Sequence, residues 1–218
     1  MATILAPSLK QRFAELQAER ERDWPLARLA ANAVQRGRLV ERFDAGAIAQ
    51  VGDTLPAVRF ADVEGGIIAL EDLLADGPAV LVFFRFATCP ACNIALRYYE
   101  ETLYPALRAW GVPLLALSPQ RPDLLGEIKT RQQLSFRVAS DPDNDLAGFL
   151  GITFVPDDRP APPPRGWIGE VTGTGNWALP QPTALIVAPD RTIRWLRVSP
   201  DWLDRAEAGE IVAALDDA

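Results

Sequence analysis

Hydrophobic and polar positions alternate with two different periods along this chain, and the first period is helical. The apolar residues of the first segment recur every three or four positions: Leu5, Leu9, Phe13 and Leu16. This spacing among charged residues predicts an amphipathic helix, and Pro25 is placed to open a second helix that runs towards Phe43. We therefore predict a helical extension over residues 1–48 and a main domain over residues 49–218.

After residue 52 the period changes to that of strands. The continuous apolar runs at 79–84 and 112–117 have the length and composition of strands buried on both faces. Helical spacing follows each run, over 92–110 with a break at Pro105 and over 122–134. Alternating strands and helices favour parallel strands joined by crossovers.

Shorter signals complete the expected order of elements. Residues 58–69 and 183–198 predict antiparallel hairpins, 136–139 a short strand, and 202–215 a closing helix. The stretch 155–182 is rich in proline and glycine, so it is either an ordered functional loop or a mobile insert. Strand, helix, strand, helix, hairpin and helix is the order of an α/β thioredoxin fold, a central mixed sheet flanked by helices.

Composition narrows the chemistry. The 218 residues include no histidine, which excludes Cys-His and Ser-His catalytic units and imidazole ligands. With 22 basic and 29 acidic residues the net charge is −7, so we expect no nucleic-acid partner. We expect no metal and no cofactor, and we interpret the carboxylates at 141–145 as a turn before a capped helix. No leader or spanning segment is recognisable, so we expect a cytoplasmic protein without a membrane partner.

The two cysteines are the strongest chemical signal. Cys89 and Cys92 form a Cys-Pro-Ala-Cys motif after the 79–84 strand, at the expected start of a helix. A helix N-terminus favours a thiolate, so we predict an exposed Cys89 with a lowered pKa as nucleophile and Cys92 as the resolving thiol. Cys89 would attack a disulfide or a peroxide, and Cys92 would close the Cys89–Cys92 bond.

Two neighbours are candidates for tuning this pair. Arg85 precedes Cys89 by four residues, and a cation there would lower the thiol pKa further; a surface arginine at a strand end is the alternative. Thr88 would cap the helix or donate a hydrogen bond to the sulfur.

Beyond this order of elements, the chain resembles the AhpC/TSA family of peroxiredoxin-like redoxins. The resemblance rests on VGDTLP at 51–56, LVFFR at 81–85, CPACN at 89–93, LSPQ at 117–120, SDP at 140–142 and NWALPQPT at 176–183. It implies a disulfide or hydroperoxide substrate, a cellular dithiol reductant, and a cis Pro182 whose preceding backbone faces the thiols. The resemblance is also compatible with a homodimer.

The chain departs from the family at several positions. Peroxiredoxins carry a hydroxyl residue three positions before the reactive cysteine and a proline four positions earlier, where this chain has Phe86 and Val82. Gln181 precedes Pro182, and Phe83 replaces the buried acid of thioredoxins. We therefore rank thiol–disulfide oxidoreductase first, thiol peroxidase second, and a non-cycling redox sensor or interaction protein third.

Overall fold

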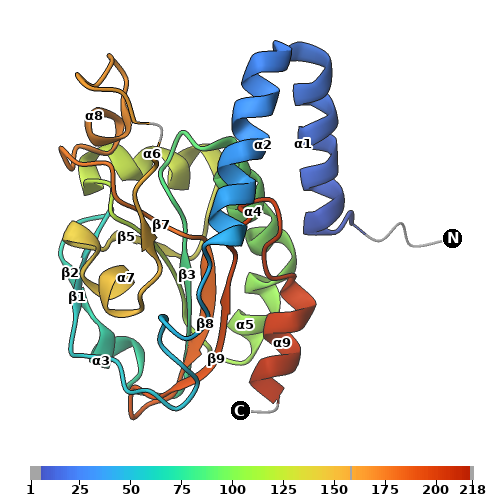
Figure 1. The fold of residues 1–218 in the computed structure, drawn as a ribbon. Helices are drawn as coiled ribbons and strands as arrows, with labels where there is room; N and C mark the ends of the chain where they lie inside the picture. The colour runs from blue at the N-terminus through green and yellow to red at the C-terminus, as the bar shows by residue number, and fades with distance from the viewer. Residues whose placement is uncertain (1–5, 158, 217–218) are drawn as a thin grey trace, which may run out of the picture.

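A mixed sheet forms the centre of the molecule (Figure 1). The computed structural model describes residues 6–157 and 159–216, and within them seven strands make up this sheet. In spatial order they are β2 (Ile67–Ala69), β1 (Arg59–Asp62), β5 (Arg137–Ser140), β4 (Leu114–Ser118), β3 (Ala79–Phe83), β8 (Thr183–Val187) and β9 (Ile193–Val198). β3, β4 and β5 are parallel to one another, and the other pairings are antiparallel. β3 therefore lies inside the sheet, and the loop that follows it begins at the carboxyl end of the parallel strands.

Helices cover both faces of the sheet. One face packs against α3 (Leu70–Leu73) and α7 (Asp145–Phe149), the latter preceded by a short 3-10 helix at Pro142–Asn144. The other face packs against α4 (Pro90–Thr102), α5 (Tyr104–Ala109), α6 (Pro122–Gln132) and α9 (Ala208–Asp216). Alternate residues of β3 serve the two faces, Val80 and Val82 one core and Leu81 and Phe83 the other.

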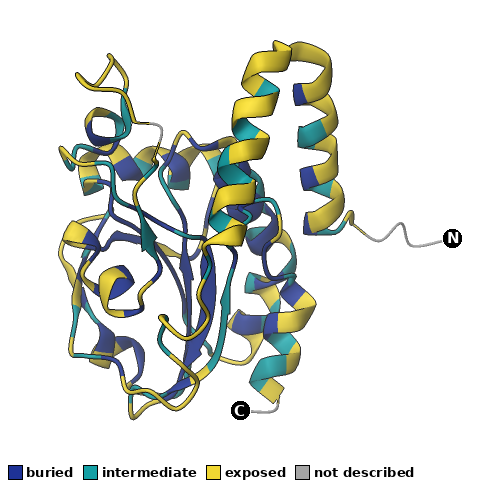
Figure 2. Cartoon of the chain, in the orientation of Figure 1, coloured by how far each residue is buried: buried dark blue, intermediate teal, exposed yellow. Residues whose placement is uncertain are grey.

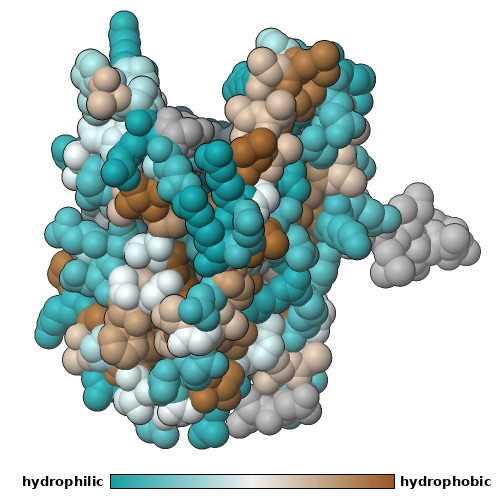
Figure 3. Space-filling model, viewed as in Figure 1, coloured by the Kyte–Doolittle hydropathy of each residue, from teal (hydrophilic) through white to brown (hydrophobic). Residues whose placement is uncertain are grey.

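An N-terminal helical hairpin stands beside this body. It consists of α1 (Leu9–Asp23) and α2 (Leu26–Glu41), and its turn projects from the body in Figure 1. α1 buries Leu9, Phe13 and Arg20, whereas α2 buries no residue, as its yellow and teal colouring in Figure 2 shows. Figure 3 shows brown residues on the outside of the hairpin, in agreement with the 83% exposure of Leu26.

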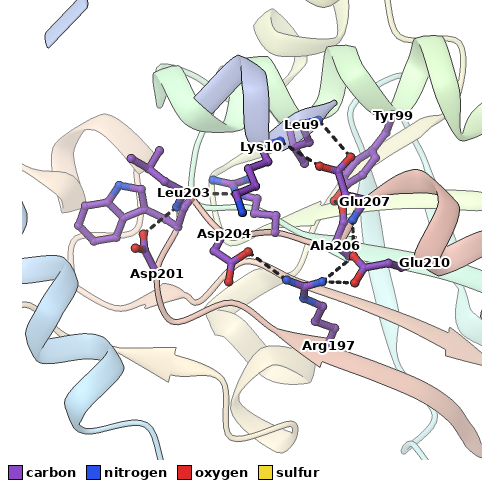
Figure 4. A network of polar contacts seen from close by, with 12 residues as sticks. Leu9, Lys10, Tyr99, Arg197, Asp201, Leu203, Asp204, Ala206, Glu207 and Glu210 are labelled. Carbon is purple, nitrogen blue, oxygen red and sulfur yellow. Dashed lines mark hydrogen bonds and ion pairs between the residues drawn. The ribbon is translucent and has the colours of Figure 1, made fainter. Parts of the chain in front are cut away.

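The beginning of α1 is fastened to the segment before α9. Ser8 forms a capping box with Gln11, and the Glu207 carboxylate accepts hydrogen bonds from the backbone N–H of Leu9 (3.0 Å) and Lys10 (2.9 Å) (Figure 4). The same carboxylate accepts from the Tyr98 hydroxyl at 2.6 Å. A single carboxylate thus joins α1, α4 and the C-terminal segment.

The predicted element order is confirmed, with local differences. The two predicted N-terminal helices are present, although Leu5 lies outside the described residues. Proline shortens the helix after the cysteines as expected, since α4 ends and α5 begins around Leu103. The division at residue 48 stays a prediction. No helix among the described residues has the length and apolarity needed to span a bilayer.

The 155–182 stretch and the closing helix differ more. The stretch contains α8 (Ile168–Thr172) and β7 (Leu179–Pro180), and β7 pairs with β6 (Thr153–Phe154). The closing helix begins at Ala208 rather than at Trp202. The Asp201 side chain accepts from the Leu203 N–H at 2.9 Å, which holds these residues in a turn.

Candidate functional site

The cysteines sit where the loop after β3 becomes α4. Pro90 is the first residue of the helix, and Cys89 is its N-cap. The Cys89 sulfur accepts a hydrogen bond from the backbone N–H of Cys92 at 3.3 Å. The helix dipole therefore acts on the Cys89 sulfur directly, as the sequence predicted.

The two thiols touch each other and are closed off from solvent. Their sulfur atoms are 2.6 Å apart, and both residues are 0% exposed. The expectation of an exposed Cys89 is therefore wrong. Both cysteines belong to the core that α1 and the segment before α9 complete, with Phe13 and Trp202 among its members. The sequence could not show this cover, because its parts lie at opposite ends of the chain.

A guanidinium lies beside each sulfur. Arg85 Nη2 donates to the Cys89 sulfur at 3.2 Å, and Arg205 Nη2 donates to the Cys92 sulfur at 3.5 Å. The Arg85 guanidinium lies over the Trp202 ring, 4.4 Å from its centroid. The tuning role predicted for Arg85 is thus supported by contact, and Arg205 is a site residue that the sequence analysis missed.

The thiols titrate as one unit, because a hydrogen bond joins them. Burial, together with the Cys92 hydrogen bond, raises the pKa of Cys89 well above its ordinary value. Burial opposes ionisation of Cys92 as well, but the hydrogen bond from Cys89 and the charges of Arg205 and Arg85 outweigh it, so the pKa of Cys92 is lowered well below its ordinary value. This is the reverse of the predicted order. The first proton leaves easily, and the second is retained between the sulfurs.

A third guanidinium approaches from the hairpin. Arg20 of α1 is 6% exposed, and its Nε and Nη1 atoms have no hydrogen-bond partner. Burial lowers the pKa of Arg20, whereas a thiolate at Cys89 would raise it and the positive charge of Arg85 lowers it. The Arg20 guanidinium lies over the Trp24 ring, 4.8 Å from its centroid. Sequence analysis offers no signal for this residue beyond its helical spacing with Leu9 and Phe13.

Side chains after β4 and in α4 hold the loop that carries Arg85. The Ser118 hydroxyl donates to the Arg85 carbonyl at 2.9 Å, and Gln120 Oε1 accepts from the Ala87 N–H at 2.7 Å. Asn93 Nδ2 donates to the carbonyls of Ala87 and Cys89, both at 2.8 Å. The 117–120 motif therefore shapes the loop that presents the first thiol.

Thr88 and Pro182 do not have the predicted roles. Thr88 is exposed, and Cys89 itself occupies the N-cap position. The Gln181–Pro182 bond is trans, since within the described residues the cis bond is Ala161–Pro162. The Gln181 N–H donates to the Ile152 carbonyl and the Pro182 carbonyl accepts from the Ser199 N–H, each at 2.8 Å. Internal pairing thus uses the backbone that was expected to face the thiols.

Three carboxylates near the site in sequence, those of Glu100, Glu101 and Asp141, are engaged by other partners. Glu101 pairs with Arg12 and Arg97, and Glu100 accepts from the Ser135 N–H. Asp141 caps α7 by accepting from two backbone N–H groups at 3.0 Å, so the turn interpretation of 141–145 is confirmed. The described residues contain no cluster of three metal-ligating side chains.

A mixed sheet with a dithiol at the N-terminus of the helix after its inner strand defines a thioredoxin-fold protein. The AhpC/TSA family profile matches residues 51–196. The chain therefore belongs to the AhpC/TSA family. Arg20 and Arg205 both lie outside the matched residues.

Relatives in sequence and structure agree with this assignment. The chain is 28% identical to peroxiredoxin bcp1 of Schizosaccharomyces pombe over 102 residues, 47% of this chain and 52% of that protein. It is 30% identical to a putative peroxiredoxin of Mycobacterium tuberculosis over 101 residues, 46% of this chain and 62% of the relative. The chain thus spans less than two thirds of each. The crystal structure of peroxidoxin BcpB from M. tuberculosis shares the fold, with a TM-score of 0.59 and 20% identity over 77% of this chain and 97% of that one.

Proposed function

We propose that the protein is a thiol-dependent oxidoreductase that reduces a disulfide or a hydroperoxide with Cys89 and Cys92. The observation that carries this proposal is the pair of sulfurs 2.6 Å apart, each beside a guanidinium. Such contact allows a disulfide to form without rearrangement of α4. The guanidiniums stabilise negative charge on the sulfurs before and during the reaction.

Disulfide reduction starts from the thiol pair after it has lost one proton, with the remaining proton held between the two sulfurs. Cys89 attacks one sulfur of the substrate, the remaining proton stays with Cys92, and the first product leaves as a thiolate. Cys92 then attacks Cys89, its proton goes to the second leaving thiolate, and the Cys89–Cys92 disulfide forms. Two electrons pass to the substrate, and a dithiol reductant returns them to the protein.

A hydroperoxide would use the same atoms. Cys89 takes the terminal oxygen and becomes a sulfenic acid, its proton leaves with the alcohol, and Cys92 expels hydroxide to form the same disulfide. Membership of a family whose relatives are named peroxiredoxins favours this second reaction. The absence of a hydroxyl group at Phe86 favours the first.

The burial of the thiols bears on the size of the substrate. Both sulfurs are enclosed, and the backbone on each side of Pro182 is already paired. A folded protein disulfide would need a free edge at this place. These contacts support a small-molecule substrate over a protein disulfide.

Stopped-flow oxidation of the reduced protein, followed by tryptophan fluorescence, tests the proposal because Trp202 lies against Arg85. Hydroxyethyl disulfide and hydrogen peroxide are supplied separately, each with dithiothreitol as the recycling reductant. We expect turnover in the wild type and none in Cys89→Ser. When dithiothreitol is left out, Cys92→Ser should instead accumulate a trapped mixed disulfide. Thr88→Ala, at an exposed neighbour, serves as the control. A wild type that is oxidised once and is not recycled would identify a sensor instead.

A further inference from the structure

Positive charge gathers around the dithiol although the chain as a whole is acidic. Arg85 and Arg205 contact the sulfurs, and Arg20 is buried on the neighbouring helix α1. The guanidiniums of Arg20 and Arg28 both lie over the Trp24 ring, 4.8 and 3.8 Å from its centroid. Among the ion pairs of the described residues, Arg36 has a carboxylate partner, Asp201, and Arg20, Arg85 and Arg205 have none. Two guanidiniums therefore contact the thiol pair, and none of Arg20, Arg85 and Arg205 is neutralised by a carboxylate among the described residues.

The packing of α1 explains how Arg20 reaches this position. α1 runs antiparallel to α4: Arg12 pairs with Glu101 at 2.7 Å, and further along a surface groove is lined by Glu19 of α1 and Asn93 of α4. The next residue of α1, Arg20, is therefore level with the N-terminus of α4, where Cys89 lies. Arg20 continues the buried stripe of Leu9 and Phe13.

The guanidiniums retain unused donors. Arg20 Nε, Arg20 Nη1 and Arg85 Nε are buried and have no partner among the described residues. A buried charged donor without an acceptor is costly, and an anion that accepts from it removes that cost. Carboxylates suit guanidiniums because two oxygens match two N–H groups.

Resting on the proposed function, we propose that Arg20 and Arg85 form a subsite for an anionic group of the substrate, a carboxylate close to the S–S or O–O bond that is reduced. The hairpin carries Arg20 near its projecting turn (Figure 1), so movement of this end admits the substrate and its return brings Arg20 onto the anion. The N-terminal hairpin thereby selects the substrate by charge.

Three disulfides of similar size test the charge preference: dithiodipropionate is anionic, hydroxyethyl disulfide is neutral and cystamine is cationic. We expect kcat/KM of the wild type to fall in that order, by about tenfold or more between the anionic and the neutral compound, the factor expected from one charged hydrogen bond. Monoperoxysuccinate, which carries a carboxylate near its O–O bond, and peracetic acid, which carries none, form the matching peroxide pair and distinguish the two substrate sources.

Arg20→Gln should reduce the ratio of anionic to neutral rates to near one. Arg20→Lys should restore part of the ratio, and Arg22→Gln, at an exposed position of the same helix, should leave it unchanged. An equal loss for all three disulfides would overturn the subsite, because Arg20 would then act on Cys89 alone. A wild type without charge preference would overturn it as well.

The proposed function can fail separately, since a protein that turns over none of these compounds lacks the activity altogether. A binding measurement covers the case in which the Arg20 variants fold poorly. Propionate should inhibit the reduction of hydroxyethyl disulfide by the wild type, whereas propionamide at the same concentration should not. Equal inhibition by both, or by neither, would count against the subsite.

Discussion

Arg205 donates a hydrogen bond to the sulfur of Cys92 at 3.5 Å, although 113 residues separate the two in the chain. Its Nε also donates to the Trp202 carbonyl at 3.0 Å, so the guanidinium is fixed between the turn before α9 and the thiol. Where thioredoxins carry an acid that would serve the second cysteine, this chain has Phe83 and, from another direction, the cation of Arg205. The guanidinium stabilises negative charge on the resolving sulfur but does not accept its proton.

Arg205→Met should raise the pKa of the first proton lost by the thiol pair, because one of the two guanidiniums that stabilise the thiolate is gone. The midpoint of this titration should rise by about one pH unit, corresponding to the ~1.5 kcal/mol of a hydrogen bond to a charged group. Thiolate absorbance against pH measures the titration directly. Arg194→Met, at an exposed position of β9, is the control, and identical titrations of the two variants would contradict the role.

Glu207→Gln should weaken the attachment of α1, because a neutral amide has one oxygen to offer to the three donors that the carboxylate now serves. We expect the free energy of unfolding in urea to fall by about 1–3 kcal/mol. Glu21→Gln, at an exposed position of α1, should change it by less than about 0.5 kcal/mol. Equal effects of both substitutions would show that Glu207 does not hold α1.

Arg36 holds α2 to the body through a bidentate pair with Asp201, at 2.8 and 2.7 Å. Because α2 buries no residue, Arg36→Ala should raise the rate of hydrogen exchange throughout α2 and the rate of thiol alkylation. Each rate should rise about tenfold, which corresponds to a loss of ~1.4 kcal/mol from the free energy that holds α2 against the body. Arg38→Ala, an exposed neighbour, should have little effect. Unchanged alkylation in Arg36→Ala would mean that α2 does not limit access to the thiols.

Because Arg36 pairs with Asp201, the packing of α2 against the body depends on pH. Burial acts to raise the pKa of Asp201, but hydrogen bonds from Arg36 and from the Leu203 N–H outweigh it, and the pKa is lowered. A carboxyl with a lowered pKa in the closed state stabilises that state above its ordinary pKa of about 3.9 and loses the effect as the pH falls through the lowered value. The protection factors of the α2 amides, which correct for the intrinsic pH dependence of exchange, should therefore fall below about pH 4 in the wild type and show no such fall in Asp201→Asn.

Asp141 should change the free energy of unfolding with pH in the opposite direction to Asp201. Burial raises its pKa to about 6, despite two backbone hydrogen bonds that lower it. The folded state then binds the proton more tightly than the unfolded chain, whose value is about 3.9, so stability from this group is present below about pH 4 and is lost as the pH rises through 6. The loss amounts to about 3 kcal/mol.

Asp141→Asn should remove this part of the pH dependence, as measured by urea unfolding between pH 4 and pH 7. Asp143→Asn, at an exposed position of the same turn, should keep it. A wild-type stability that does not fall over this range, relative to Asp141→Asn, would contradict the assignment.

Local signals made much of the fold and the thiol pair predictable. The apolar run of β3 and the helical spacing after Cys92 depend on neighbours in sequence, and so does the contact of Arg85 with Cys89, four residues away. Arg205, Arg20 and Glu207 depend instead on packing between distant segments, for which a single sequence has no periodic signal. The exposure of Cys89 was misjudged for the same reason.

Pro182 shows a different limit. Its place before β8 was predicted correctly, but the isomer of a proline bond depends on what its neighbours need from the backbone. Here the Gln181 N–H donates to the Ile152 carbonyl, and the Pro182 carbonyl accepts from the Ser199 N–H. The small sheet of β6 and β7 and the end of β9 bring these groups together. None of these partners is visible from the residues around Pro182 alone.

The attachment of α1 through Glu207 has a consequence for the order of biosynthesis. Chains emerge from the ribosome N-terminus first, so α1 and both cysteines are made long before Arg205 and Glu207. Until these late residues appear, α1 lacks the carboxylate at its first turn and Cys92 lacks its guanidinium. The nascent thiols therefore lack the Arg205 contact and the C-terminal part of their cover, and both are added only when the last segment of the chain folds.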